Sequence, residues 1–300
     1  MWDSFVDESK NGTFLLKRGY MDYHSDRFDD CSLMVWDGSG RLVAVLPACK
    51  DGDTVYSHRG LTYGGWVVPL KHLDVTVMLD VWNAMTEWLK GIGVRHLVYK
   101  AIPHIYHSYP SEEDQYALFR NGARIVSTYV SSTIPLESPI IFNENARRGM
   151  KNALKNGVTV EKTDDFSAFW QILSQLLKEK YGTTPVHTLD EIRLLKGRFP
   201  ENIKLYVAKC AGEVVAGTVM YYTGSVAHAQ YIAASAKGKE LKALPMLFDY
   251  IIKNECGCCR YFDFGTSNED GGRYLNEGLV RQKCGMGGRA IVYNVYQVDF

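Results

Sequence analysis

Two acid–base side chains stand inside apolar segments in the second half of the sequence. Asp263 lies in Tyr261-Phe-Asp-Phe264, directly before Gly265, and His228 lies in the apolar run Val226–Ala233. A carboxylate in apolar surroundings is either paired or has a raised pKa, so it can act as a base or hold an amine. The histidine can do the same, or it can be a core residue whose ring nitrogens are satisfied. These two residues are our first candidates for proton transfer.

Basic residues form a second candidate group. Arg147, Lys151 and Lys155 recur every four residues, and no acid occurs between Asn145 and Val160. On a helix this spacing makes a stripe that can hold the phosphates of a nucleotide-linked precursor or a tRNA. A solvated helix face has the same pattern, so both interpretations stay open.

The loop Tyr56–Trp66 combines hydrogen-bond donors, aromatic rings and flexible glycines, and it contains Arg59 and Tyr63. This composition is typical of a loop that lines a substrate site. It is also compatible with a tight structural turn.

The cysteines do not indicate a disulfide framework. There are seven of them, an odd number, which fits reduced thiols in a cytosol. Cys256-Gly-Cys258-Cys259 could bind a metal together with Cys284 or His228, but no second cysteine pair follows. We therefore expect no metal and interpret these residues as small buried thiols.

Composition restricts the class of protein. The 300 residues are 46% hydrophobic and 23% charged, close to the average for soluble globular chains. Thirty-four basic and thirty-four acidic residues give no net charge, so any polyanion site must be a local patch. No apolar stretch reaches the roughly 18 residues of a membrane helix, and acids stand where a signal peptide needs a basic end. We expect a cytoplasmic protein without a membrane span.

The elements that position these residues recur when the sequence is compared with itself. Arg41–Gly52 followed by Thr54–His58 matches Glu213–Gly224 followed by Val226–Gln230 at an offset of 172 residues. Each copy predicts strands, and the same order of elements follows it: helix (75–89, 240–253), strand (95–99, 260–264), helix (114–121, 272–284) and strand (124–130, 289–295).

A boundary separates the two copies. Pro135 and Pro139 interrupt regular structure between them. We therefore expect an α+β protein with two domains, 1–137 and 138–300, each a mixed sheet flanked by helices.

This order of elements resembles the GNAT N-acyltransferases, and the tandem arrangement resembles the Fem peptidoglycan-bridge aminoacyltransferases. The resemblance is carried by Trp2 and Phe5, Asn11–Phe14, Asp26–Ser32, Ser57–Gly65, Arg147–Lys151, Gly157–Val160, Gln230-Tyr231, Phe262–Gly265, Leu275–Leu279, Lys283 and Gly285. It implies two tandem GNAT-like domains, with the donor site in the second. The residues it implicates in substrate binding are Arg59, Tyr63, Arg147, Lys151, Tyr231 and Lys283, and those in catalysis are Asp263, His228 and Tyr274.

In GNAT enzymes one strand splays at a bulge, which frees backbone N–H groups for the acyl carbonyl. The next loop places N–H groups against a pyrophosphate. The resemblance assigns these roles to Val226–Ala233 and to Ala234–Glu240. In the loop, the expected contacts to the donor phosphates are Ser235, Lys237, Gly238 and Lys239.

Two departures from the family pattern affect the choice of donor and acid. Glu240 stands where the family fingerprint R/Q-x-x-G-x-G/A has its second small residue, and a carboxylate repels a diphosphate. Arg281 stands where many members have a tyrosine that protonates the leaving thiolate, so Tyr274, two turns earlier, is the substitute candidate.

The function implied is transfer of an acyl group from acyl-CoA to a primary amine of a small molecule. One alternative is a Fem-type transferase that uses aminoacyl-tRNA and acts on a cell-wall precursor. The other is a non-catalytic tandem domain that binds a nucleotide-sugar, peptide or protein partner. Zero net charge favours a small thioester donor, whereas the incomplete phosphate fingerprint favours the aminoacyl-tRNA.

Overall fold

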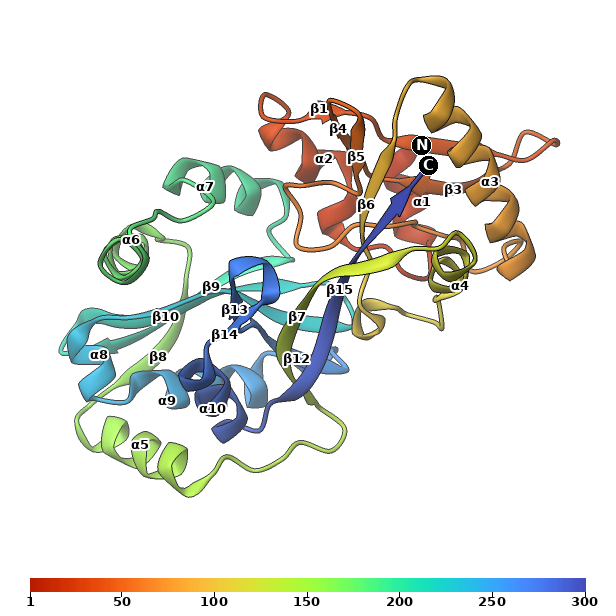
Figure 1. Cartoon of the computed structure of the whole chain (residues 1–300). Helices are drawn as coiled ribbons and strands as arrows, with labels where there is room; N and C mark the ends of the chain where they lie inside the picture. Colours follow the sequence, from red (N-terminus) through yellow and green to blue (C-terminus); the bar gives the residue numbers. More distant parts are fainter. The chain divides into compact units, whose positions relative to one another are not determined.

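The computed structural model describes residues 1–300 and divides the chain into two compact units (Figure 1). Unit 1 consists of Met1–Val130, Asn268–Leu275 and Val292–Phe300, and unit 2 consists of Ser131–Ser267 and Asn276–Ile291. The chain therefore passes between the units four times. Both units combine strands with helices, so the expected α+β class is confirmed. The duplicated domains 1–137 and 138–300 stay a prediction, because a compact unit is not the same thing as a repeated domain.

Unit 1 contains a mixed sheet in the order β1-β4-β5-β6-β15-β7 and two separate hairpins, β2-β3 and β13-β14. Its elements are α1 (Trp2–Glu8), α2 (Arg18–Met21), β1 (Asp29–Asp30), β2 (Leu33–Trp36), β3 (Leu42–Leu46), β4 (Cys49–Asp51), β5 (Thr54–Tyr56), α3 (Val75–Gly91), β6 (His96–Lys100), α4 (Glu113–Arg120), β13 (Asn268–Glu269), β14 (Tyr274–Leu275) and the larger parts of β7 (Arg124–Pro135) and β15 (Arg289–Asp299).

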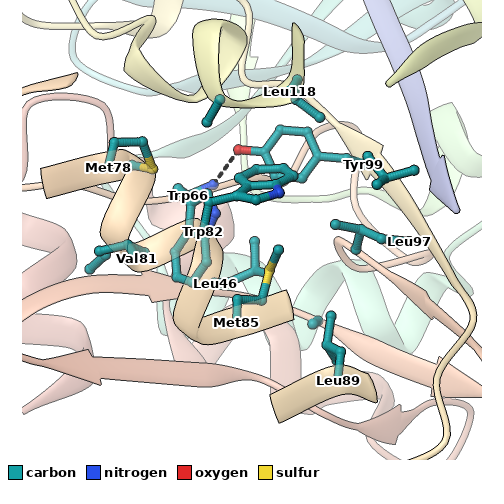
Figure 2. Close-up of a cluster of buried hydrophobic side chains, with 14 of the residues drawn as sticks. Leu46, Trp66, Met78, Val81, Trp82, Met85, Leu89, Leu97, Tyr99 and Leu118 are labelled. Carbon is teal, nitrogen blue, oxygen red and sulfur yellow. Dashed lines mark hydrogen bonds between the residues drawn. The ribbon is translucent and has the colours of Figure 1, made fainter. Parts of the chain in front are cut away.

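Helix α3 forms because its apolar residues recur at helical spacing behind a strong cap. The Asp74 carboxylate accepts hydrogen bonds from the N–H groups of Thr76 (2.8 Å) and Val77 (3.0 Å), which satisfies donors left open by the first turn. Its inward face carries Met78, Val81, Trp82, Met85 and Leu89, which pack against Leu46, Leu97 and Tyr99 of the sheet (Figure 2). This apolar layer is the core of unit 1.

A buried polar chain crosses this core. The Tyr99 hydroxyl accepts a hydrogen bond from the backbone N–H of Trp66 (2.7 Å), as Figure 2 shows, and donates one to the Asp114 carboxylate (2.6 Å). Burial raises the pKa of Asp114 to about 6, although the bond from Tyr99 opposes the shift. The core therefore contains a carboxylate that is costly to ionise.

Unit 2 contains a mixed sheet in the order β7-β12-β11-β10-β9-β8. Its elements are the end of β7, α5 (Glu144–Lys155), β8 (Thr159–Thr163), α6 (Ser167–Tyr181), α7 (Leu189–Arg198), β9 (Ile203–Cys210), β10 (Glu213–Tyr222), β11 (Val226–Ala234), α8 (Ala236–Glu240), α9 (Ala243–Asn254), β12 (Tyr261–Thr266), α10 (Glu277–Gly285) and the start of β15.

Helix α9 covers one face of the unit 2 sheet, and α6 covers the other (Figure 1). Leu247, Phe248 and Ile251 of α9 join Tyr206 and Met220 of the strands in one apolar cluster. Helix α5 packs on α9 through its small residues, which leaves its polar face in solvent. The sheet is thus buried on both sides, and one long face of α5 stays exposed.

The two segments aligned by the offset of 172 residues form similar strand pairs. In unit 1, β5 pairs in parallel with β6 through Thr54↔His96, Val55↔Leu97 and Tyr56↔Val98. In unit 2, β11 pairs in parallel with β12 through Val226↔Tyr261, Ala227↔Phe262 and His228↔Asp263. The β5 and β11 partners are the residues that the offset of 172 aligns, and each parallel pair ends after three residues.

The copies differ in their earlier strands. Glu213–Tyr222 is one strand, β10, whereas the matching segment of unit 1 breaks into β3 and β4 around Pro47. Proline has no N–H for the sheet, which explains the break. The predicted helix 240–253 is also divided, since α8 ends at Glu240 and α9 begins only at Ala243.

We predict that Asp114→Asn stabilises the protein at neutral pH. The folded-state pKa of about 6 lies above the ordinary value of 3.8, so the favourable contribution of the protonated carboxyl is present below pH 3.8 and is lost as the pH rises through 6. The asparagine carries no charge and still accepts the bond from Tyr99. Urea unfolding should show a gain at about pH 7.5 that disappears near pH 4. Asp80→Asn, on the exposed face of α3, is the control, and a gain that does not vary with pH would contradict the assignment.

Candidate functional site

Strands β11 and β12 of unit 2 part after their third residue pair. The last pair is His228↔Asp263, and no pairing between the two strands follows it. Each strand is irregular just beyond this point. On β11 the register against β10 shifts so that Gln230 is an extra residue, and on β12 the register against β7 shifts between Asp263 and Thr266. Bulges bend a strand and end its pairing, so the two together open the fork.

A hydrogen-bond network fills the base of this fork. One oxygen of Asp263 accepts hydrogen bonds from the hydroxyls of Ser131 (2.5 Å) and Thr133 (2.9 Å), and the other bonds to His228 Nδ1 (2.8 Å). The Asp263 side chain is fully buried and that of His228 is 10% exposed. The carboxylate fixes the orientation of the imidazole, and the tautomer protonated on Nδ1 keeps a lone pair on Nε2. A histidine oriented by a carboxylate in this way is a candidate general base, and this role stays a prediction.

Lys283 connects the end of β12 to α10. Its buried ammonium donates to the carbonyl oxygens of Gly265 (2.8 Å) and Thr266 (2.8 Å) and to the hydroxyl of Ser267 (3.0 Å). Burial lowers the pKa of Lys283 to about 8, and the Asp263 carboxylate opposes this shift. Three acceptors use all three protons of an ammonium. Lys283 therefore holds β12 in place.

Gly265 lets β12 pass close to the imidazole. Its φ of +75° lies in the left-handed region, and a Cβ there would stand 3.3 Å from Cε1 of His228. Only glycine adopts this conformation without strain. The bend in β12 after Asp263 therefore depends on the glycine at position 265.

Tyr231, which lies on β11 beyond the fork, makes a second polar contact. The hydroxyl of Tyr231 is hydrogen-bonded to Nδ1 of His187, which lies in the loop between α6 and α7. The Trp170 ring meets the Tyr231 ring edge-on, with centroids 5.2 Å apart. Tyr231 is buried, so in this conformation it anchors the α6–α7 loop to β11.

The loop expected to hold donor phosphates is a capped helical turn. The Ser235 hydroxyl accepts a hydrogen bond from the N–H of Gly238 (3.1 Å) and donates one to the carbonyl of Val215 (3.1 Å). The N–H groups of Lys239 and Leu241 bond to carbonyls of the same turn. Within the segment Ala234–Glu240 that the resemblance assigns to the phosphates, the N–H groups of Gly238 and Lys239 are therefore already occupied.

Few side chains of this turn are available to bind a diphosphate. Lys237 pairs with Glu213 (3.2 Å), and Lys239 is exposed. Gly238 is required by close packing, since a Cβ would stand 2.1 Å from the Val215 carbonyl oxygen. Close packing therefore explains why position 238, in the partial fingerprint, is a glycine.

The basic stripe lies on α5 as the spacing predicted. Arg147, Arg148, Lys151 and Lys155 are all exposed. None of them forms an ion pair, although most other surface arginines of the chain do. The face is therefore an unneutralised positive surface in unit 2.

Three of the predicted site residues belong to unit 1. Arg59 pairs with Asp51 (2.5 Å) and lies over the Tyr56 ring. Tyr63 is buried and donates a hydrogen bond to Thr13 (3.0 Å). Tyr274 is 56% exposed on β14. The network of His228 and Asp263 includes none of them, and their roles stay predictions.

The corresponding fork in unit 1 is closed. Beyond the last pair, the Ser57 hydroxyl accepts a hydrogen bond from the N–H of Lys100 (2.7 Å). The Lys100 ammonium then donates to the carbonyls of Arg59 and Leu61. The loop after β5 is thus held over the end of β6, so only unit 2 keeps an open edge.

A family model matches the segment that contains this fork. The model, described as an acetyltransferase (GNAT) domain, matches residues 142–274. This segment is a GNAT domain. It includes His228, Asp263 and the α8 turn, whereas Lys283 lies beyond it. The GNAT resemblance inferred from sequence is therefore confirmed.

Solved structures match the chain over its whole length. FemX aligns with a TM-score of 0.71 at 13% identity, covering 100% of this chain and 95% of that one. The C-terminal domain of a putative lysylphosphatidylglycerol synthetase from Agrobacterium fabrum aligns with a TM-score of 0.64 at 15% identity, covering 99% and 92%. L-PGS from Bacillus licheniformis aligns with a TM-score of 0.62 at 15% identity, covering 99% and 90%. The tandem GNAT-like fold is thereby confirmed.

Other comparisons were negative. No curated protein matches the chain in sequence. No helix combines the length and apolar character needed to cross a membrane. No three His, Cys, Asp or Glu side chains gather closely enough to hold a metal ion.

We predict that Lys283→Met destabilises unit 2 by about 3 kcal/mol, because two buried carbonyls lose a charged donor and Asp263 loses a nearby cation. Urea unfolding measures the change. Arg281→Met on the same helix is the control, since its side chain is 80% exposed and only pairs with Glu277; we expect it to change stability by less than about 0.5 kcal/mol. Equal effects of the two substitutions would show that Lys283 is not an anchor.

Proposed function

We propose that this protein is an N-acyltransferase whose reaction takes place at the β11–β12 fork of unit 2. The observation that carries the proposal is the buried pair of Asp263 and His228 at the point where the strands part. This places a candidate base beside a strand edge without a strand partner. Backbone N–H groups on such an edge can stabilise the oxyanion of acyl transfer.

The reaction joins an amine to an activated carbonyl. The amine nitrogen bonds to the carbonyl carbon and gives up a proton to Nε2 of His228. The tetrahedral intermediate collapses, its bond to the leaving oxygen or sulfur breaks, and the same proton passes to that atom. The products are an amide and a free hydroxyl or thiol. Asp263 keeps the imidazole oriented and stabilises its protonated form, and the ammonium of Lys283, which donates to three acceptors on residues 265–267, holds β12 in place.

For the donor, we favour an aminoacyl ester of tRNA over acyl-CoA. A CoA diphosphate needs several free N–H groups in the loop before α9, and those of Gly238, Lys239 and Leu241 are already used. The unpaired basic face of α5 suits a longer polyanion better than a small thioester. One protein of the same fold is named for the synthesis of lysylphosphatidylglycerol, which carries an aminoacyl group.

For the acceptor, we favour a primary amine on a nucleotide-linked cell-wall precursor, in line with the FemX-like fold. Acyl-CoA transfer to a small amine is the second candidate, because the α9 N-terminus has no side-chain cap and leaves N–H groups of its first turn open. Both candidates use the same fork and differ in the group that carries the acyl chain.

A transfer assay separates the donors. The purified protein is incubated with a nucleotide-linked precursor that bears a free amine, and with either total tRNA charged with labelled amino acids or labelled acetyl-CoA. We expect label in the precursor only from charged tRNA. Calorimetric titration with CoA should then show no saturable binding. Transfer from acetyl-CoA would support the second candidate, and transfer from neither would leave a binding module.

The base is tested by substitution at the pair. We predict that His228→Ala lowers kcat by about 10²–10⁴-fold, the usual contribution of a general base. Asp263→Asn should lower it as well, because the amide no longer supplies the negative charge that orients the imidazole. Circular dichroism and the melting temperature verify folding. His104→Ala, at an exposed position of unit 1, is the control. Unchanged kcat in folded His228→Ala would exclude this mechanism.

The basic face is tested by charge reversal. We predict that Lys151→Glu weakens tRNA binding several-fold and reduces its salt dependence, since each phosphate contact releases a counterion. Lys162→Glu, which reverses an exposed charge on β8, is the matched control. Filter binding at several salt concentrations gives both quantities. If the two variants behave alike, the stripe is only a solvated helix face.

A further inference from the structure

Gln230 is the extra residue of the bulge on β11. Its neighbours pair with β10 through Ala229↔Met220 and Tyr231↔Val219, which leaves Gln230 without a partner in the ladder. It lies two residues beyond His228, where β11 no longer pairs with β12. The side-chain oxygen Oε1 is buried from solvent and accepts no hydrogen bond. The sequence places an amide here, in a strand whose other residues are mostly apolar.

An unsatisfied buried acceptor is expensive. Leaving such a group without a donor costs about 1–3 kcal/mol, and a methionine or leucine at this position would avoid that cost. Other polar side chains nearby are satisfied, since Asp263 has three donors and Tyr231 bonds to His187. A buried polar group without a partner in a folded protein calls for an explanation, such as a catalytic role or a bound water or ion. The bulge at the open edge is where an acyl group would lie under the function proposed above.

We propose that Gln230 is the specificity-determining residue for the acyl group, and that its Oε1 accepts a hydrogen bond from an N–H donor on the carbon next to the acyl carbonyl. This inference rests on the proposed function and names its substrate class, aminoacyl groups with a free α-amine. The nitrogen of such an amine is two bonds from the carbonyl carbon, so a residue beside the carbonyl can reach it. An acetyl or propionyl group has no donor there and leaves Oε1 unpaired.

This hydrogen bond also determines how strongly the site should discriminate between aminoacyl and desamino acyl donors. A site built to hydrogen-bond a substrate N–H rejects the analogue that lacks it far more strongly than an apolar pocket rejects a missing methylene. The wild-type protein should therefore prefer an aminoacyl donor over the matching desamino acyl donor by at least about 100-fold in kcat/KM. The preference should depend on the acceptor oxygen of Gln230.

The test uses two donors that differ in one group. The same RNA is esterified either with an amino acid that the transfer assay identifies or with its desamino analogue. Gln230→Met keeps the length of the side chain and removes the acceptor, and Gln282→Met at an exposed position of α10 is the control. For Gln230→Met we expect kcat/KM to fall at least about tenfold with the aminoacyl donor and to stay unchanged with the desamino donor.

A second measurement needs no activity. Without substrate, Gln230→Met should raise the melting temperature, because it removes the buried unpaired acceptor. A lower melting temperature together with equal losses on both donors would mean that Gln230 is a structural residue, and the inference would be overturned. Equal use of both donors by the wild type would overturn it while the proposed function stands. Transfer of neither donor would instead contradict the proposed function, and the melting temperature alone would then decide whether the Gln230 acceptor is unpaired.

Discussion

The burial of the Asp263 carboxylate is the constraint on which the rest of unit 2 depends. A charge removed from water is tolerated only when donors surround it. Here the donors come from β7 and β11, and the ammonium on α10 lies close enough to act on the carboxylate. Each element that forms the fork is thus held to the others through one acid. A substitution that weakens any of these contacts will affect stability and geometry together.

The parallel strand pairs β5–β6 and β11–β12 can be compared, because only the second pair contains this acid. Val98 in β6 corresponds to Asp263 in the parallel pairing. In unit 1, where this residue is apolar, the Ser57 hydroxyl bonds to the backbone of Lys100, and the Lys100 ammonium holds the loop after β5. In unit 2, where it is an acid, hydroxyls and an imidazole surround it, and the strands stop pairing.

Much of this could be predicted from the sequence. The order of elements and the exposed basic face of α5 follow from periodicity. Polar residues in apolar strands indicate His228 and Asp263 as candidates, but not that they bond to each other. The hydroxyl partners could not be predicted, because Ser131 and Thr133 lie about 130 residues away from Asp263 along the chain. Lys283 has the appearance of an ordinary helix-surface lysine, and only tertiary packing buries it. The capped form of the loop after β11 could not be predicted either, because the Ser235 hydroxyl also bonds to a carbonyl of β10.

The return of the chain to both units after Ser267 has a consequence for its synthesis on the ribosome. Strand β15 lies between β6 and β7 in the sheet order, and α10 carries the ammonium that holds β12. A nascent chain that ends at Leu275 lacks both. Because contacts between distant segments form only when both segments exist, neither unit can reach its final state by then. Both units therefore reach their final state only after the last segment, Asn276–Phe300, has been synthesised.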